Sequence, residues 1–162
     1  MLAIVLMSAM GGAAILIFHT TLLSWSAQTQ RAGTDIPLDR AVEEMVRDLR
    51  KATQIQSNAG YDEIRYTQDG SNFYVFYLYN ASDAYSPPPA FNQSSYQLRR
   101  AALSGGIGGT FTYGGGTLLT PDVLPPPTSD LSVGANLLTL DVSAKKDDET
   151  LRARTQVRPR NL

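Results

Sequence analysis

The chain has 162 residues, a formal net charge of −1 and no cysteine. This length allows one domain with an appendage. The near-neutral charge argues against nucleic acid as the main partner, because nucleic-acid-binding surfaces carry a basic excess. The lack of cysteine excludes disulfides, thiolate metal ligands and cysteine nucleophiles.

The N-terminal segment is strongly apolar. Residues 1–18 carry no charge, and His19 is the only titratable side chain before Trp25 is reached. A helix needs about 20 apolar residues to cross a bilayer, so residues 1–25 predict a transmembrane helix with Trp25 as an interfacial anchor. The alternative is a cleaved signal peptide, which would show a positive n-region and a small-residue cleavage site. Here the apolar run begins without Lys or Arg and the helical pattern continues without a polar break.

Small residues are interleaved through this segment. Ser8 with Gly12, and Ala9 with Ala13, form small-xxx-small pairs that let helices approach closely. Gly11 beside Gly12 also weakens a helix, by up to about 1 kcal/mol per glycine. We therefore predict a helix-packing interface, with an ordinary membrane helix as the alternative. Its residues are Ser8, Ala9, Gly11, Gly12 and Ala13.

A second helical pattern follows an interruption at Asp35 and Pro37. Pro37 removes a backbone donor and disfavours helical geometry at the residue before it, while Asp35 could cap a new helix. Either a kink or a restart fits. Beyond it, apolar residues recur at spacings of three and four and predict an amphipathic half over residues 35–56 whose stripe packs on a sheet. These apolar residues are Leu38, Ala41, Val42, Met45, Leu49, Ala52 and Ile55.

The remainder of the chain, residues 57–162, is β-rich. Asp69-Gly70 between two apolar-aromatic runs is a strong hairpin signal. We expect strands at 63–68, 72–79, 96–103, 110–113, 136–144 and 151–157, with loops at 83–89 and 120–130. The predicted fold class is α+β: a long N-terminal helix over residues 1–56, membrane-spanning in its first half, packed on an antiparallel sheet.

With this order of elements the chain resembles the type IV pilin superfamily. Met1 to Met10 is similar to the part of a prepilin helix just after its start, although the Phe-Thr-Leu opening and the Glu at the fifth place are absent; the match fits if Met1 follows that Glu directly. The nearest resemblance is to J-type minor pseudopilins of type II secretion. It is carried by residues 38–41 followed by residues 47–52, by the short stretch 96–100 and by residues 155–162.

The resemblance implies a non-enzymatic subunit at the tip of a periplasmic filament for protein secretion. The chain would sit in the bacterial inner membrane with its domain in the periplasm, and then assemble with other minor and major pseudopilins. Secreted cargo is a further expected partner, and no nucleic acid is expected. Two alternatives remain: a minor pilin of a type IV pilus for adhesion, motility or DNA uptake, and a single-pass membrane-anchored envelope binding protein.

No residue pattern supports catalysis or a cofactor. His19 lies in the apolar stretch, where a Ser-His-Asp arrangement is improbable. The glycine runs at 105–109 and 114–116 match neither dinucleotide nor Walker spacing, so turns are expected. Asp147-Asp148-Glu149 near Asp141 could hold calcium but lacks EF-hand spacing, and a solvated hairpin turn is favoured.

The C-terminal arginines suggest a partner surface. Arg152, Arg154, Arg158 and Arg160 are spaced by even numbers and would line one face of the last strand. They could dock a neighbouring subunit or an anionic surface; the alternative is a solvated face that discourages edge-to-edge aggregation. Tyrosines at 74, 85 and 96 could also contribute to a partner interface.

Overall fold

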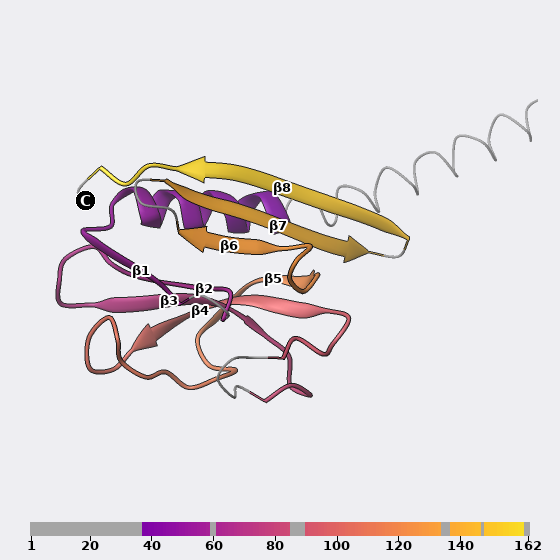
Figure 1. Cartoon of the computed structure of the whole chain (residues 1–162), viewed down its shortest axis with the longest axis horizontal. Coiled ribbons are helices and arrows are strands. Elements are labelled where there is room, and N and C mark those ends of the chain that lie inside the picture. Colours follow the sequence, from indigo (N-terminus) through magenta and orange to yellow (C-terminus); the bar gives the residue numbers. More distant parts are fainter. Residues whose placement is uncertain (1–36, 59–60, 85–89, 134–136, 147, 161–162) are drawn as a thin grey trace, which may run out of the picture. The chain divides into compact units, whose positions relative to one another are not determined.

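The computed structural model describes residues 37–58, 61–84, 90–133, 137–146 and 148–160. The chain divides into two units, Met1–Ile36 and Pro37–Leu162, and the first lies outside the described residues. In the second unit a helix over residues 37–50 precedes eight strands (Figure 1). The strands are β1 (Gln54–Asn58), β2 (Glu63–Thr67), β3 (Phe73–Tyr79), β4 (Tyr96–Leu103), β5 (Thr117–Val123), β6 (Asp130–Val133), β7 (Leu138–Lys146) and β8 (Glu149–Val157).

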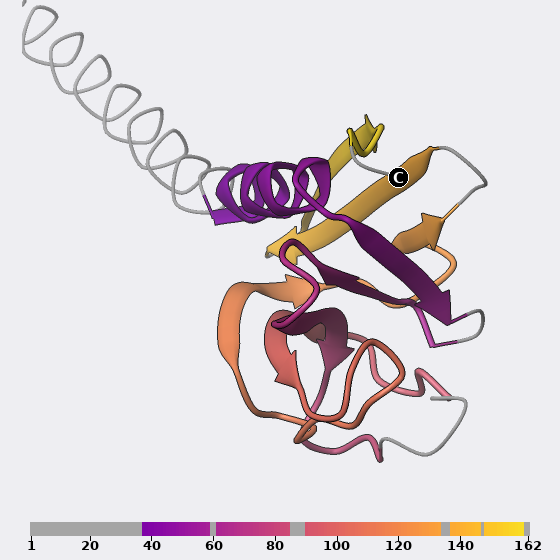
Figure 2. The same ribbon diagram turned by 90° about the vertical axis from the view of Figure 1, so that its left-hand side faces the viewer.

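All eight strands belong to one antiparallel sheet, which bends into a half-barrel (Figure 2). Its order is β1-β2-β3-β4-β5-β7-β6, with β8 on the other edge of β7. The two parts, β1–β5 and β6–β8, meet through a single pair, Val123 with Ala144. One further hydrogen bond, from Leu124 N–H to the Ser143 carbonyl at 2.8 Å, supports this junction. The bend therefore occurs where the sheet is joined most weakly.

The helix fills the inside of this bend. Leu38, Ala41, Met45 and Leu49 are buried in one core with side chains from β2 to β8. The predicted apolar stripe is thus confirmed as core packed on a sheet. Burying each large aliphatic side chain contributes about 1.5–3 kcal/mol relative to an exposed one. Because this core draws on both parts of the sheet, the helix holds the two parts together.

The predicted fold class is wrong for this unit. The structure is mostly antiparallel β, with one helix that ends at residue 50 rather than near residue 56. No helix within the described ranges is long and apolar enough to cross a membrane. The predicted transmembrane half, residues 1–25, lies outside the described residues.

The helix ends early because the backbone that follows it forms hydrogen bonds with the sheet. Lys51 and Ala52 donate to the carbonyls of Asp48 and Leu49, three residues back, which tightens the last turn. Thr53 N–H then bonds to the Thr67 carbonyl at 2.8 Å. Ile55, expected on the helix face, pairs instead with Tyr66 in the β1–β2 ladder. A helical spacing of apolar residues therefore continued across a real boundary.

Two strands, β5 and β6, were not predicted, and the expected loop overlaps both. Residues 120–130 were expected to form a proline-rich loop, but β5 continues to Val123 and β6 begins at Asp130. The β4–β5 register shifts twice, and Asp122 adopts a left-handed φ of 57°. Such an irregular strand tolerates Pro121, which a regular central strand does not. At the expected strand 110–113, the structure has a single bridge between Ser104 and Thr110.

The predicted hairpin at Asp69-Gly70 is confirmed between β2 and β3. The Asp69 carboxylate accepts hydrogen bonds from the backbone N–H groups of Ser71 at 2.9 Å and Asn72 at 2.7 Å. These bonds, led by those from Asn72, lower the pKa of Asp69 to about 2. Gly70 has a φ of 72°, which favours glycine.

One polar contact links the helix to the sheet. Asp48, 7% exposed, accepts a hydrogen bond from the Tyr66 hydroxyl at 2.9 Å and lies 3.3 Å from the Arg100 guanidinium. Arg100 also lies 3.7 Å from Glu44, one helical turn earlier, and its guanidinium stacks over the Tyr74 ring at 4.4 Å. Burial and the neighbouring Asp48 carboxylate raise the pKa of Tyr66. The helix face and strands β2 to β4 are thus fixed in register by one ionic centre.

The glycine-rich loop at 104–116 covers the opposite face of β3 and β4. Tyr77, buried there with Phe111 packed on it, donates its hydroxyl to the Gly115 carbonyl at 2.8 Å. Arg65 donates to the carbonyls of Ile107 at 3.3 Å and Gly109 at 2.8 Å. A phosphate loop leaves its backbone N–H groups for the ligand. Here the N–H groups of Gly109 and Gly115 donate to the carbonyls of Gly106 at 3.0 Å and Thr112 at 2.9 Å.

A buried carboxyl lies where the β1–β2 turn meets β6. Asp62 has a φ of 47° and accepts the Leu131 N–H at 2.8 Å, while its second oxygen is buried without a hydrogen-bond partner in the described structure. Burial raises its pKa to about 6, against the lowering effect of the Leu131 hydrogen bond and with a small contribution from Asp130.

Replacing Arg100 with methionine should lower the free energy of unfolding by about 2–3 kcal/mol, because Asp48 then stays buried without its cation. The estimate is below that for a fully buried pair since the Arg100 side chain is 26% exposed. Urea unfolding followed by circular dichroism measures it. The exposed helix residue Arg40, changed to methionine as a control, should alter stability by under about 0.5 kcal/mol. Equal effects of the two substitutions would contradict the assigned role of Arg100.

Asp62→Asn should remove a pH dependence of stability. The folded-state pKa of about 6 exceeds the ordinary 3.8, so the carboxyl stabilises the fold fully below pH 3.8 and loses that contribution as pH rises through about 6. Asparagine keeps the acceptor for Leu131, tolerates positive φ and carries no charge. We expect it to raise stability above pH 6 by about 1 kcal/mol. Urea unfolding across this range, with exposed Asp148→Asn as the control, tests it; an unchanged pH slope in Asp62→Asn would refute it.

Candidate functional site

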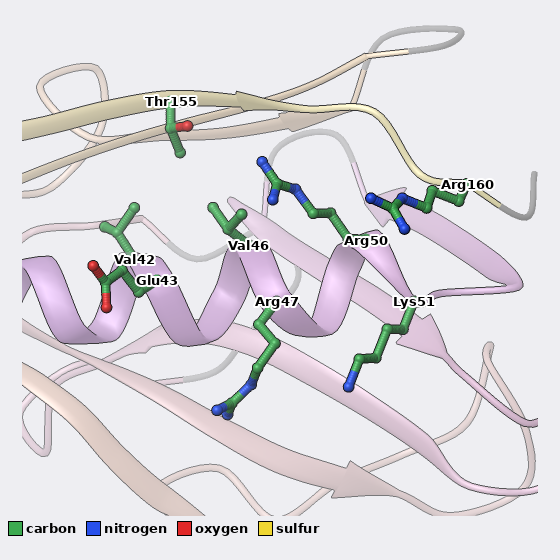
Figure 3. A pocket seen from close by; sticks show the side chains of 8 residues that line it. All are labelled: Val42, Glu43, Val46, Arg47, Arg50, Lys51, Thr155 and Arg160. Atoms are coloured by element: carbon green, nitrogen blue, oxygen red, sulfur yellow. The ribbon is translucent and has the colours of Figure 1, made fainter.

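A groove of about 500 Å³ lies between the helix and β8 (Figure 3). The helix supplies five of its lining residues, and Lys51 follows the helix directly. Strand β8 supplies one, and the segment after β8 supplies the last. The lining is mixed, with aliphatic side chains and long cations. Its members are Val42, Glu43, Val46, Arg47, Arg50, Lys51, Thr155 and Arg160.

Helical periodicity creates the floor of the groove. Val42, Val46 and Arg50 are spaced by four residues and form one row, which in Figure 3 points towards Thr155. Val42 is buried, and Val46 is half-buried against the main core. The floor is therefore apolar at Val42 and Val46 and becomes cationic at Arg50.

The cationic end of the groove gathers residues from two distant parts of the chain. The backbone N–H of Arg160 donates to the Arg50 carbonyl at 3.3 Å, which brings the C-terminal segment to the end of the helix. In the described part of the chain, Arg50, Lys51 and Arg160 have no carboxylate within 4.0 Å. Arg47, largely exposed, lies 3.8 Å from Asp48. Glu43 is the one acid among the lining residues.

The four arginines of the predicted partner surface separate into two groups. Arg152 and Arg154 lie on β8 and are exposed, but both contact Asp141 on the neighbouring strand β7. Arg152 makes two hydrogen bonds to that carboxylate, at 2.7 and 2.5 Å. These bonds hold the pKa of Asp141 below its usual range and raise that of Arg152. This pair cross-links the β7–β8 hairpin.

Arg158 and Arg160 follow β8, which ends at Val157. Both side chains are exposed, and Arg160 lines the groove. The structure therefore brings Arg160 together with the helix cations, whereas Arg152 and Arg154 pair on the hairpin. A role of Arg152, Arg154, Arg158 and Arg160 in binding a partner stays a prediction.

The other predicted site residues fall largely outside the described part. The helix-packing residues Ser8, Ala9, Gly11, Gly12 and Ala13, and Asp35 of the predicted kink, lie there, as does His19. Pro37 is the first described residue of the helix. Its position fits the first turn of a helix, where a missing N–H is tolerated.

Two tyrosines expected at an interface are engaged in the fold. Tyr96 is 2% exposed, and its hydroxyl donates to Asp83 at 2.5 Å. Burial, followed by this hydrogen bond, raises the pKa of Tyr96 to about 12. Tyr74 is half-buried beneath Arg100. The expectation of exposed rings is wrong at both positions, since each ring packs on the sheet; Tyr85 lies outside the described residues.

The side chains that line the groove offer few kinds of chemical group. Thr155 is the one hydroxyl among the lining residues, and neither histidine nor cysteine lines the groove. Across the residues that the structure describes, no three His, Cys, Asp or Glu side chains gather as metal ligands do. What remains is an apolar floor, a cluster of cations and one acid, which together can hold a polypeptide or an anionic group.

A smaller cavity of about 270 Å³ is lined by Asn80, Gln97 and their neighbours. Its polar groups already have partners. Asn80 donates to the Ser95 carbonyl at 2.7 Å, and Gln97 accepts from Arg99 at 2.7 Å. It offers fewer unpaired groups than the groove.

The sequence pattern contained only part of the groove. The sequence pattern placed Val42 in the apolar stripe and Arg160 in the predicted partner surface; Val46 and Thr155 were not singled out. Val42, Val46 and Arg50 are spaced four residues apart, and this spacing is the signal that could have shown that they form one row on the helix. Nothing in the sequence shows that Arg160 returns to the helix.

Comparisons with protein-family models, with curated proteins and with solved structures find no match to this chain.

Proposed function

We propose that the chain is a non-enzymatic assembly subunit. Its apolar N-terminal segment holds it in the inner membrane and packs with sister subunits, and its β-rich unit, on the periplasmic side, docks a neighbouring protein. The observation that carries the proposal is the groove beside the helix, which combines an apolar floor with unpaired cations and lacks a nucleophile–base pair. Such a surface can recognise a protein partner.

The finer proposal is a minor pseudopilin at the tip of a type II secretion filament. It rests on the sequence resemblance, whose stretches 47–52 and 155–162 also supply five of the eight lining residues of the groove. A filament subunit needs a docking surface on its globular part as well as packing between its N-terminal segments. The groove and the small residues near Gly12 are suited to these two tasks.

A membrane-anchored envelope binding protein would use the same apolar segment as a simple anchor. It would need no close approach between N-terminal segments of different subunits. A minor pilin of a type IV pilus would need that approach, as a pseudopilin does. The packing of the N-terminal segment therefore separates an assembly subunit from a solitary anchor.

Cross-linking through the N-terminal segment tests the proposal. Because the chain has no cysteine, Ala9→Cys would provide a single reactive thiol for bismaleimide cross-linking to neighbouring subunits in cell membranes. We expect adducts with other prepilin-class subunits, identified by mass spectrometry. Adding Gly12→Leu should reduce their yield roughly tenfold, since a large side chain blocks close helix approach.

The control is Ile15→Leu, which changes the shape of a side chain in the same segment but not its size. Circular dichroism of the purified double variant checks that the β-rich unit is unchanged. A cysteine variant that yields no cross-linked partner would favour the solitary anchor. Full cross-linking despite Gly12→Leu would contradict packing through the small residues.

A further inference from the structure

We propose that the groove binds an acidic segment of a partner protein, one that carries aliphatic side chains beside its carboxylates. This inference rests on the proposed function and names the chemistry of its partner. The carboxylates would meet the cations at the Arg50–Arg160 end, and the aliphatic side chains would cover Val42 and Val46.

The first argument is a group of cationic side chains that make no ion pair with other described residues. Arg50, Lys51 and Arg160 line one end of the groove, and each lacks an ion pair within the described ranges. Cations in the last turn of a helix also interact favourably with the helix dipole. That effect accounts for Arg50 and Lys51 but gives no reason for Arg160, which arrives from the C-terminal segment through its bond to the Arg50 carbonyl. A third cation at this point favours an anionic ligand.

The second argument is the distribution of charge along the groove. Glu43 lies along the helix from the cations, nearly two turns before Arg50. An acidic residue there repels a ligand that is anionic along its whole length. The groove therefore favours a segment with its negative charge at one end, and gives it a direction along the helix.

The third argument is the apolar floor. Val46 is half-buried and forms this floor together with Val42, while Thr155 faces the floor from β8 (Figure 3). A phospholipid headgroup needs cations but gains nothing from a recessed floor of branched aliphatic side chains between a helix and a strand. A peptide with aliphatic groups at one end and carboxylates at the other uses both features, since apolar contacts add to charge complementarity at protein interfaces.

The neighbouring strand adds a backbone surface. Among the described strands, β8 pairs with β7 alone and forms an edge of the sheet. Edge strands present unpaired N–H and C=O groups that accept a further extended chain. An acidic segment in extended form would thus lie beside an available edge as well as beside the cations.

Peptide binding to the purified full chain in zwitterionic micelles tests the proposal. The probe is a short fluorescent peptide with valines at one end and glutamates at the other, and its counterpart carries glutamine in place of each glutamate. Fluorescence anisotropy should show binding of the glutamate peptide that weakens as salt rises. Arg50→Gln with Arg160→Gln should weaken it by about tenfold or more. Val46→Asp should weaken it as well, by placing a negative charge on the floor.

The matched control is Arg40→Gln with Lys145→Gln. It removes two exposed cations that do not line the groove, and binding should stay within roughly twofold of the parent chain. Circular dichroism confirms that each variant is folded. Equal losses in both double variants, equal binding of the glutamine peptide, or no loss in the groove variant would each overturn the proposal.

Two further outcomes would name another occupant. If phosphatidylglycerol added to the micelles displaces the peptide from the parent chain, the groove is a headgroup site and the proposal fails. Self-association that disappears in Arg50→Gln/Arg160→Gln would identify a second copy of the chain instead. Peptide binding is independent of cross-linking through position 9. If the peptide does not bind but cross-linking is intact, the groove proposal fails and the assembly role stands. If the peptide binds but no subunit is cross-linked, only the assembly role is removed.

Discussion

The contact between Asp48 and Arg100 governs how the helix sits in the half-barrel. A carboxylate placed among apolar side chains is costly unless a cation and hydrogen bonds satisfy it. Arg100 supplies the charge, Tyr66 supplies a hydrogen bond, and the Tyr74 ring lies under the guanidinium. Because these partners come from β2, β3 and β4, the contact fixes the rotation of the helix about its axis. A small rotation would break several interactions together.

That fixed rotation matters because the sheet alone is poorly joined. Its two parts share one paired position, Val123 with Ala144, so backbone hydrogen bonds do little to set the angle between them. The buried stripe of the helix contacts residues of both parts in a single core. The helix thus determines the curvature of the sheet, and the curvature places β8 beside the helix flank, where the groove forms.

Local patterns in the sequence predicted what depends on neighbouring residues. The apolar stripe of the helix, the turn at Asp69-Gly70 and most of the strands follow from periodicity and turn chemistry. The pattern was wrong where distant backbone decided the outcome. The pairing of Thr53 with Thr67 ends the helix, and a strand irregularity at Asp122 accommodates Pro121 within β5. The groove escaped prediction for the same reason, since the bond between Arg160 and Arg50 has no local signature.

The charge of the groove depends on which cations the acidic side chains of the helix contact. In the second half of the helix, Asp48 is buried beside Arg100, and the partly exposed Glu44 lies 3.7 Å from the same guanidinium. The usual helical partner of Asp48 would be a cation three or four residues away, such as Lys51. Within the described residues Lys51 has no acid, and neither do Arg50 and Arg160 beside it in the groove. The ionic centre that orients the helix therefore also leaves the groove cationic, and stability and recognition in this unit share one cause.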